Sequence, residues 1–239
     1  NANRRSASLS RIEFASNLGA DELCNNMWWS QPAPSCVILD VGAFDIKTGY
    51  GNIFPCFKPE FIHRTCIGTE KMNVIRPLSS AGQGSQGEVF ACGDAAISRS
   101  TLLNISYPKL SGAGELIENN DFDALINILD SVLFTSEDGL ALVEGTCQYP
   151  HGAYINAPTD APLPFVLIEN AGDDVYLRQR MVQTLFERFS APAVVVLNSA
   201  VLAMRAYDEF GYRCGGSGLV VDIGHAGTRV CIVEDYKIS

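Results

Sequence analysis

Apolar residues between positions 164 and 197 follow a strand, helix, strand pattern. Residues 164–169 and 193–197 are short apolar runs with the length of buried strands, and residues 173–189 repeat apolar positions at helical spacing. Because short connections join the three segments, they predict a right-handed βαβ unit and a central sheet that is partly parallel. Four side chains of the two strands are expected to be buried in that sheet: Phe165, Leu167, Val194 and Val196.

Helical spacing recurs at two other places. It predicts one helix over residues 121–134 and another over residues 199–207. The first of these has a continuous apolar face, which is typical of a helix that packs on a core rather than of a binding groove. The face consists of Phe122, Leu125, Ile126, Leu129, Val132 and Leu133.

Shorter apolar runs predict the remaining strands. Residues 60–67 and 102–105 each read as one strand. Residues 89–96 predict a strand, a turn and a short helix, and Asp94 stands where its carboxylate can cap that helix. Residues 71–88 are rich in glycine and serine, and they predict a loop.

Two similar turns carry the candidate chemistry. In residues 36–51 an apolar run ends at Asp40 and Gly42 and is followed by Lys47, which predicts two strands around a tight turn. Residues 218–233 repeat the pattern around Asp222 and Gly224, without a lysine at the matching place. Glycine lets backbone N–H groups approach an anion, aspartate can hold a hydrated divalent cation, and lysine attracts phosphate. The pair therefore predicts that the two turns together bind the phosphates of one nucleotide.

The candidate site follows from these turns. Asp40 and Asp222 are the candidate ligands of a cation. His225 is either a phosphate contact or a turn histidine that faces solvent. The candidate nucleotide-binding residues are Asp40, Gly42, Ala43, Phe44, Lys47, Asp222, Gly224, His225, Ala226, Gly227 and Thr228.

Composition narrows the classes of protein. The 239 residues suffice for one or two domains, and the net charge of −10 argues against a basic face for nucleic acid. No apolar run approaches the roughly 20 residues that span a bilayer. The eight cysteines include no C-x-x-C pair, and with three histidines no zinc spacing emerges. Cysteines such as Cys36 and Cys231 stand in predicted strands as small apolar residues, which favours a reducing compartment.

These segments, in this order, resemble the actin family over roughly residues 36–239 without the loops 71–88 and 139–162. The first hairpin contributes Asp40, Gly42, Lys47, Gly49 and Tyr50, and the second contributes Asp222 and Gly224. Between the hairpins, the matching residues are Cys92 to Ala96, Leu102 to Pro108, Gly112, Glu169, Arg178, Met181, Leu185 to Phe189, Pro192, Ala193 and Ala200 to Leu202.

The resemblance implies an α/β, actin-like (ribonuclease H-like) fold: a mixed sheet with flanking helices, two phosphate-type β-hairpins and an incomplete second lobe. ATP or ADP with Mg²⁺ would lie between the lobes. On this pattern residues 1–35 are an N-terminal extension with Trp28 and Trp29 as an anchor, and residues 36–208 form the first lobe. A small outer subdomain covers about residues 60–112. Residues 209–239 are a linker and the start of the second lobe.

The departures from actin concern the phosphate contacts. Actin has serine and glycine after the first Asp-x-Gly, where this chain has Ala43 and Phe44. In the second hairpin Ile223 replaces a serine, and the glutamine that positions the attacking water aligns with Ser199. We therefore expect weak or absent nucleotide binding and no hydrolysis. If Asp40 and Asp222 face each other, then a cation, Lys47 or protonation must relieve their repulsion.

The resulting hypothesis is a non-catalytic, actin-related structural subunit of a larger cytoskeletal or motor-associated assembly, such as the flagellar axoneme. It would be cytoplasmic, with other proteins as partners, among them actin or another actin-related protein, and with neither nucleic acid nor membrane. One alternative is an ATP-binding, polymerising actin-like ATPase. A second is an actin-related subunit of a nuclear chromatin-remodelling complex. A small-molecule kinase of the same superfamily lacks a sugar-site signature here.

The resemblance stops just past the second hairpin, which leaves part of the second lobe's sheet uncovered. Either the chain continues beyond Ser239 or a partner covers this sheet. We expect the polypeptide of residues 1–239 to be insoluble or molten without such cover, because an open apolar sheet promotes aggregation.

Overall fold

The computed structural model describes residues 36–51, 59–71, 89–108, 119–135, 139–142, 148, 162–173, 175–212 and 214–239. The predicted extension 1–35 and most of the loops 71–88 and 139–162 lie outside these residues. The helices and strands are β1 (Val37–Val41), β2 (Asp45–Tyr50), β3 (Phe61–Arg64), β4 (Ile67–Glu70), β5 (Val89–Cys92), α3 (Gly93–Ser98), β6 (Leu103–Ser106), α4 (Asn119–Phe134), β7 (Phe165–Glu169), α5 (Val175–Glu187), β8 (Val194–Asn198), α6 (Ser199–Glu209), β9 (Gly218–Ile223), β10 (Thr228–Glu234) and β11 (Lys237–Ile238).

The central sheet has five strands in the order β3-β2-β1-β7-β8. Strands β1, β2 and β3 pair antiparallel, whereas β7 pairs parallel with both β1 and β8, so the predicted βαβ unit and mixed α/β sheet are confirmed. Phe165 and Leu167 are buried as expected. Val194 and Val196 are only partly buried, and Val195 is 51% exposed, because β8 is an edge strand. The prediction of a second fully buried strand was therefore wrong.

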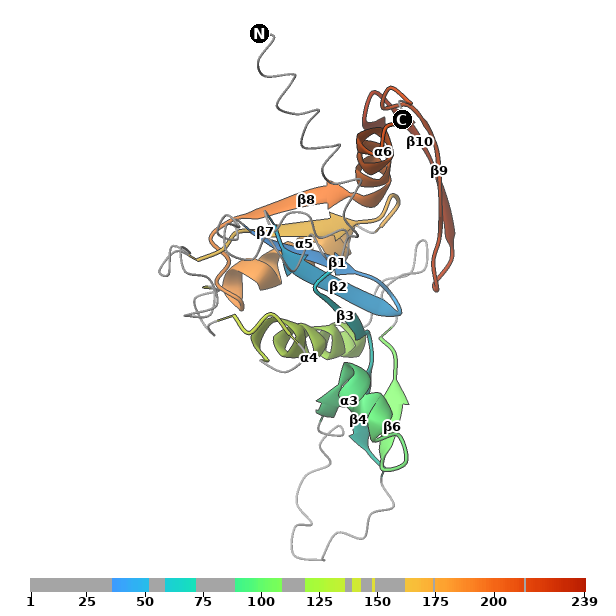
Figure 1. The fold of residues 1–239 in the computed structure, drawn as a ribbon. Helices are drawn as coiled ribbons and strands as arrows, with labels where there is room; N and C mark the ends of the chain where they lie inside the picture. Colours follow the sequence, from blue (N-terminus) through green and yellow to red (C-terminus); the bar gives the residue numbers. More distant parts are fainter. Residues whose placement is uncertain are drawn as a thin grey trace, which may run out of the picture.

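Helix α4 supplies much of the core beneath this sheet (Figure 1). Its predicted apolar face is confirmed: five of the six side chains are buried, and Ile126 is partly buried against the same cluster. Leu39 of β1, Phe165 of β7 and Leu185 of α5 belong to that cluster too. Since full burial of such a side chain contributes about 1.5–3 kcal/mol, this core holds the strands that carry the first hairpin.

A smaller sheet, in the order β5-β4-β6, lies with α3 at the bottom of Figure 1. The single strand predicted over residues 60–67 is wrong. Strand β3 ends at Arg64, Thr65 leaves the strand conformation, and β4 begins at Ile67 in a different sheet. The Thr65 backbone N–H and hydroxyl donate to the carbonyls of Phe44 and Gly42, each at 2.8 Å. The predicted Asp94 cap was also wrong: α3 begins at Gly93, its N-cap is Cys92 without a side-chain hydrogen bond, and Asp94 lies in the first turn.

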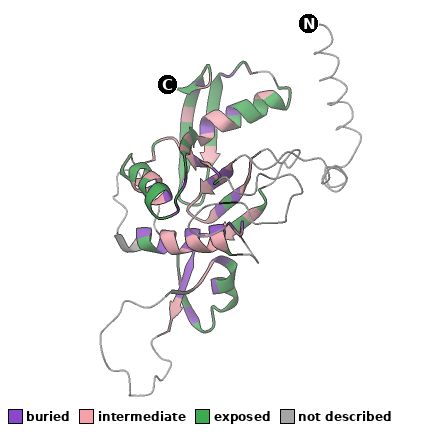
Figure 2. Ribbon diagram, turned by 90° about the vertical axis from the view of Figure 1, so that its left-hand side faces the viewer, coloured by how far each residue is buried: buried purple, intermediate pink, exposed green. Residues whose placement is uncertain are grey.

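The third sheet, in the order β11-β10-β9, contains the second predicted hairpin. One face packs on α6 through Ala200, Met204 and Val233. On the opposite face apolar side chains are more than half exposed, and Figure 2 shows the exposed residues along both strands. They are Leu219, Val221, Ile223, Val230 and Ile232. Within the described part of the chain no helix is long and apolar enough to cross a membrane.

Candidate functional site

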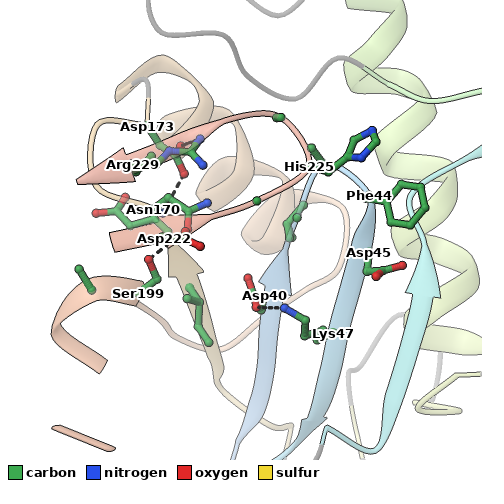
Figure 3. A pocket seen from close by; sticks show the side chains of 18 of the residues that line it. Asp40, Phe44, Asp45, Lys47, Asn170, Asp173, Ser199, Asp222, His225 and Arg229 are labelled. Carbon is green, nitrogen blue, oxygen red and sulfur yellow. Dashed lines mark hydrogen bonds and ion pairs between the residues drawn. The ribbon is translucent and has the colours of Figure 1, made fainter. Parts of the chain in front are cut away.

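The two hairpin tips, the end of β7 and the start of α6 surround a cavity of about 490 Å³ (Figure 3). Nine of the eleven candidate residues line it, and Gly227 and Thr228 do not. The nine come from two hairpins on separate sheets, so the fold brings together turns that are far apart in the sequence. They are Asp40, Gly42, Ala43, Phe44, Lys47, Asp222, Gly224, His225 and Ala226.

The first tip is a tight turn whose polar groups bond within the protein. The Gly42 N–H donates to the carbonyl of Asp45 at 3.1 Å, and a Cβ atom on Gly42 would lie 2.6 Å from that oxygen. Glycine is therefore required by the turn itself. Asp40 and Lys47 are cross-strand partners, and the Lys47 Nζ donates to the Asp40 Oδ2 at 3.2 Å. From the sequence, a cation, Lys47 or protonation was expected to relieve repulsion between Asp40 and Asp222. In the structure Lys47 forms an ion pair with Asp40.

The second tip closes by a hydrogen bond from the Gly224 N–H to the carbonyl of Gly227 at 2.9 Å. Asp222 pairs with Arg229 in the strand register, but the Arg229 Nη2 donates to the Asp173 Oδ1 at 3.0 Å instead. Burial raises the pKa of the Asp173 carboxyl, and hydrogen bonding from Asn170 and the charge of Arg229 oppose that rise. The side-chain carboxylate of Asp222 has no hydrogen bond or ion pair to any other described residue.

The back of the cavity is a network that follows β7. The Ser199 hydroxyl donates to the Asn170 Oδ1 at 3.0 Å, and the Asn170 N–H donates to the Asp173 Oδ2 at 2.8 Å. Arg178 binds Glu169 through two hydrogen bonds of 2.5 and 2.8 Å. Sequence reasoning missed Asn170, Asp173 and Arg229 as site residues. The available signal was the position of the first two at the carboxyl end of a parallel strand, where ligands of open α/β sheets bind.

Aromatic side chains join the two tips. The Phe44 ring stacks on the His225 ring, with centroids 4.6 Å apart and planes at 28° (Figure 3). His225 is exposed, as the interpretation as a turn histidine expects. Its ring also contacts Phe44 of the opposite hairpin, and neither interpretation of His225 from the sequence included this contact. At 4.6 Å the two rings are in contact, so no phosphate group can lie between them.

These residues do not fit a tightly held magnesium–nucleotide complex. Lys47 is paired with Asp40, the Ser199 hydroxyl is bonded to Asn170, and Ala43 offers no hydroxyl. The side chains of Arg178 and Arg229, which also line the cavity, are in ion pairs. Among the residues that the structure describes, no group of three or more His, Cys, Asp or Glu side chains is placed to hold a metal ion.

Comparison with known proteins identifies a family model and a curated relative. The sequence model of the actin family matches residues 32–238. Actin-related protein 2 of Schizosaccharomyces pombe (strain 972) is 26% identical to this chain over 204 residues, which are 84% of this chain and 42% of the relative. The chain thus spans less than half the length of that curated relative.

Proposed function

This chain belongs to the actin family, and from that premise we propose that it is a non-catalytic structural subunit of a larger cytoskeletal or motor-associated assembly. On this proposal the protein is cytoplasmic, and its partners are other proteins of the assembly, among them actin or another actin-related protein. Residues 1–35, 36–208 and 209–239 serve as the extension, the first lobe and the start of the second lobe.

The contact between Phe44 and His225 carries this proposal. Electrostatic positioning supplies most of the catalysis in phosphoryl transfer, so a phosphate needs donors aimed at it from both tips. Here the first tip carries an aromatic ring in place of such a donor, and that ring contacts His225 of the second tip. Each hydrogen bond to a charged group contributes about 1.5–3 kcal/mol, so the loss of two lowers affinity by roughly 10²- to 10⁴-fold.

The polymerising ATPase stays a second candidate, because Asp40, Lys47 and Asp222 still line the cavity. A role in a nuclear chromatin-remodelling complex is a further alternative, and it shares the non-catalytic site with the first proposal.

Titration calorimetry with Mg–ATP on the full-length protein tests the proposal. We expect no binding at micromolar ATP for the unmodified protein. A fourfold variant separates the tips and restores polar groups, so we expect its affinity for Mg–ATP to rise at least tenfold. Its four changes are Ala43→Ser, Phe44→Gly, Ile223→Ser and His225→Asp.

The matched control adds Lys47→Ala to that variant, which should remove the gain, because Lys47 is the cation of the first hairpin that lines the cavity. Micromolar binding by the unmodified protein, together with release of phosphate, would replace this proposal by the polymerising ATPase.

A further inference from the structure

We propose that Phe44 is a permanent joint between the three sheets, so that the two hairpins are held together by protein contacts rather than by a ligand. This inference deepens the proposed function and rests on it in one respect: no nucleotide lies between the tips.

Phe44 touches all three sheets. It stands in the β1–β2 turn of the central sheet and stacks on His225 of the β9–β10 turn. Its ring also lies nearly parallel to that of Tyr107, with an interplanar angle of 11° and centroids 5.8 Å apart. Tyr107 directly follows β6, the edge strand of the small sheet. One half-buried side chain of the central sheet thus contacts a residue at the end of each of the other two sheets.

The surroundings fix the position of this ring. The Arg64 guanidinium lies 4.4 Å from the centroid of the Phe44 ring and is itself held by the Asp45 Oδ1 at 2.8 Å. Thr65 binds the carbonyls on both sides of Ala43, those of Gly42 and Phe44. The tip therefore presents Phe44 in one orientation, which a joint requires.

A second contact holds the other end of the cavity. Arg229 of β10 forms an ion pair with Asp173, which follows β7, and both side chains are largely buried. The second hairpin is therefore attached to the central sheet both at its tip, through His225, and near the start of β10. Two separate attachments restrain rotation of the hairpin as well as its distance from the central sheet.

Hydrogen exchange of the full-length protein without nucleotide tests the joint. Phe44→Ala should accelerate exchange of the amides at 224–227 and of those at 105–107 by roughly 2- to 10-fold, as loss of aromatic stacking predicts. Phe44→Leu keeps apolar volume but no ring, so we expect an intermediate effect at both places. Leu102→Ala is the matched control, because it removes a 64% exposed apolar side chain of the same small subdomain outside the aromatic cluster.

If Phe44→Ala does not fold, His225→Ala removes one ring from an exposed turn and should accelerate exchange at 43–45. Unchanged exchange at 224–227 or at 105–107 in the Phe44 variants, or at 43–45 in His225→Ala, overturns the joint. Addition of Mg–ATP to the unmodified protein separates the two proposals. Slower exchange at both tips with ATP overturns the proposed function, whereas the joint is judged by the nucleotide-free variants alone.

Discussion

Gly42 and Phe44 stand two positions apart in one turn, and opposite constraints fix them. At position 42 a glycine is required because the carbonyl oxygen of Asp45 lies only 2.6 Å from the place where a Cβ atom would be. Phe44 needs its large side chain because the ring contacts three neighbouring side chains, those of His225, Tyr107 and Arg64. A residue of intermediate size satisfies neither position, so this tip tolerates little substitution.

The first prediction concerns Gly42→Ala. The new methyl group would lie 2.6 Å from a backbone oxygen, which cannot move without opening the turn. We expect the free energy of unfolding to fall by about 1–3 kcal/mol, the usual cost of overpacking, as measured by urea denaturation. Gly227→Ala at the other tip is the control, because no atom lies within 4 Å of its Cβ position. Equal losses in the two variants would contradict the steric explanation.

At the scale of elements, one carboxylate connects the end of α6 to the third sheet. Asp208 accepts hydrogen bonds from the Tyr236 hydroxyl and from the N–H groups of Cys214 and Gly216, the latter two at 2.6 and 2.9 Å. The Cys214 thiol also donates to the Asp208 Oδ1, at 3.1 Å. These bonds, above all those from the Tyr236 hydroxyl and the Cys214 thiol, lower the pKa of Asp208 to about 2. The helix, its connection to β9 and the β10–β11 turn therefore depend on one ionised group.

The second prediction follows from that shift. Since the pKa of Asp208 is lower in the folded protein than the value of about 3.9 of an unfolded chain, its contribution to stability is complete above pH 5. The contribution is lost as the pH falls from about 4 to 2. We expect Asp208→Asn to lower the melting temperature at pH 6 and to weaken its dependence on pH between 4 and 2. Glu209→Gln, at an exposed neighbour, is the control. An acid profile that matches the unmodified protein would contradict this role of Asp208.

The elements also show how far sequence reasoning reaches. Helix α4 and the βαβ unit were predicted correctly, because the periodicity of apolar residues is a local property of the sequence. The edge position of β8 was not predicted, because it depends on the order of strands in the sheet. The end of β3 before Thr65 was not predicted either, because it depends on hydrogen bonds from Thr65 to the first hairpin tip. The same limit applies to the site. The Asp-x-Gly turns are visible in the sequence, but the pairing of Arg229 with Asp173 rather than with its strand neighbour Asp222 arises only in the folded chain.

At the scale of the whole molecule, the third sheet has one covered face and one open face. Val221 and Val230 are register partners on the open face, as are Leu219 and Ile232, so the exposed side chains form one continuous patch. Strand β9 is also an edge strand, with one side of its backbone unpaired within the described part of the chain. An apolar face beside an open edge favours association with other chains.

The third prediction is that a polypeptide of these 239 residues, expressed alone, self-associates through this face. Val221→Thr with Val230→Thr should raise the monomeric fraction in size-exclusion chromatography, because the change reduces apolar surface without affecting the α6 side. Val220→Thr is the matched control, since Val220 packs against the cluster of α6 and should instead lower stability. A monodisperse unmodified polypeptide with a cooperative thermal transition would contradict the prediction.

The contact between Phe44 and His225 also has an evolutionary consequence. On the proposed joint, a mutation that removes the ring would loosen the contacts among three sheets before any phosphate donor is gained, and a serine at position 43 would give no benefit while the ring is in place. If both proposals hold, a single change at either tip would not restore nucleotide binding, and several changes together would be needed.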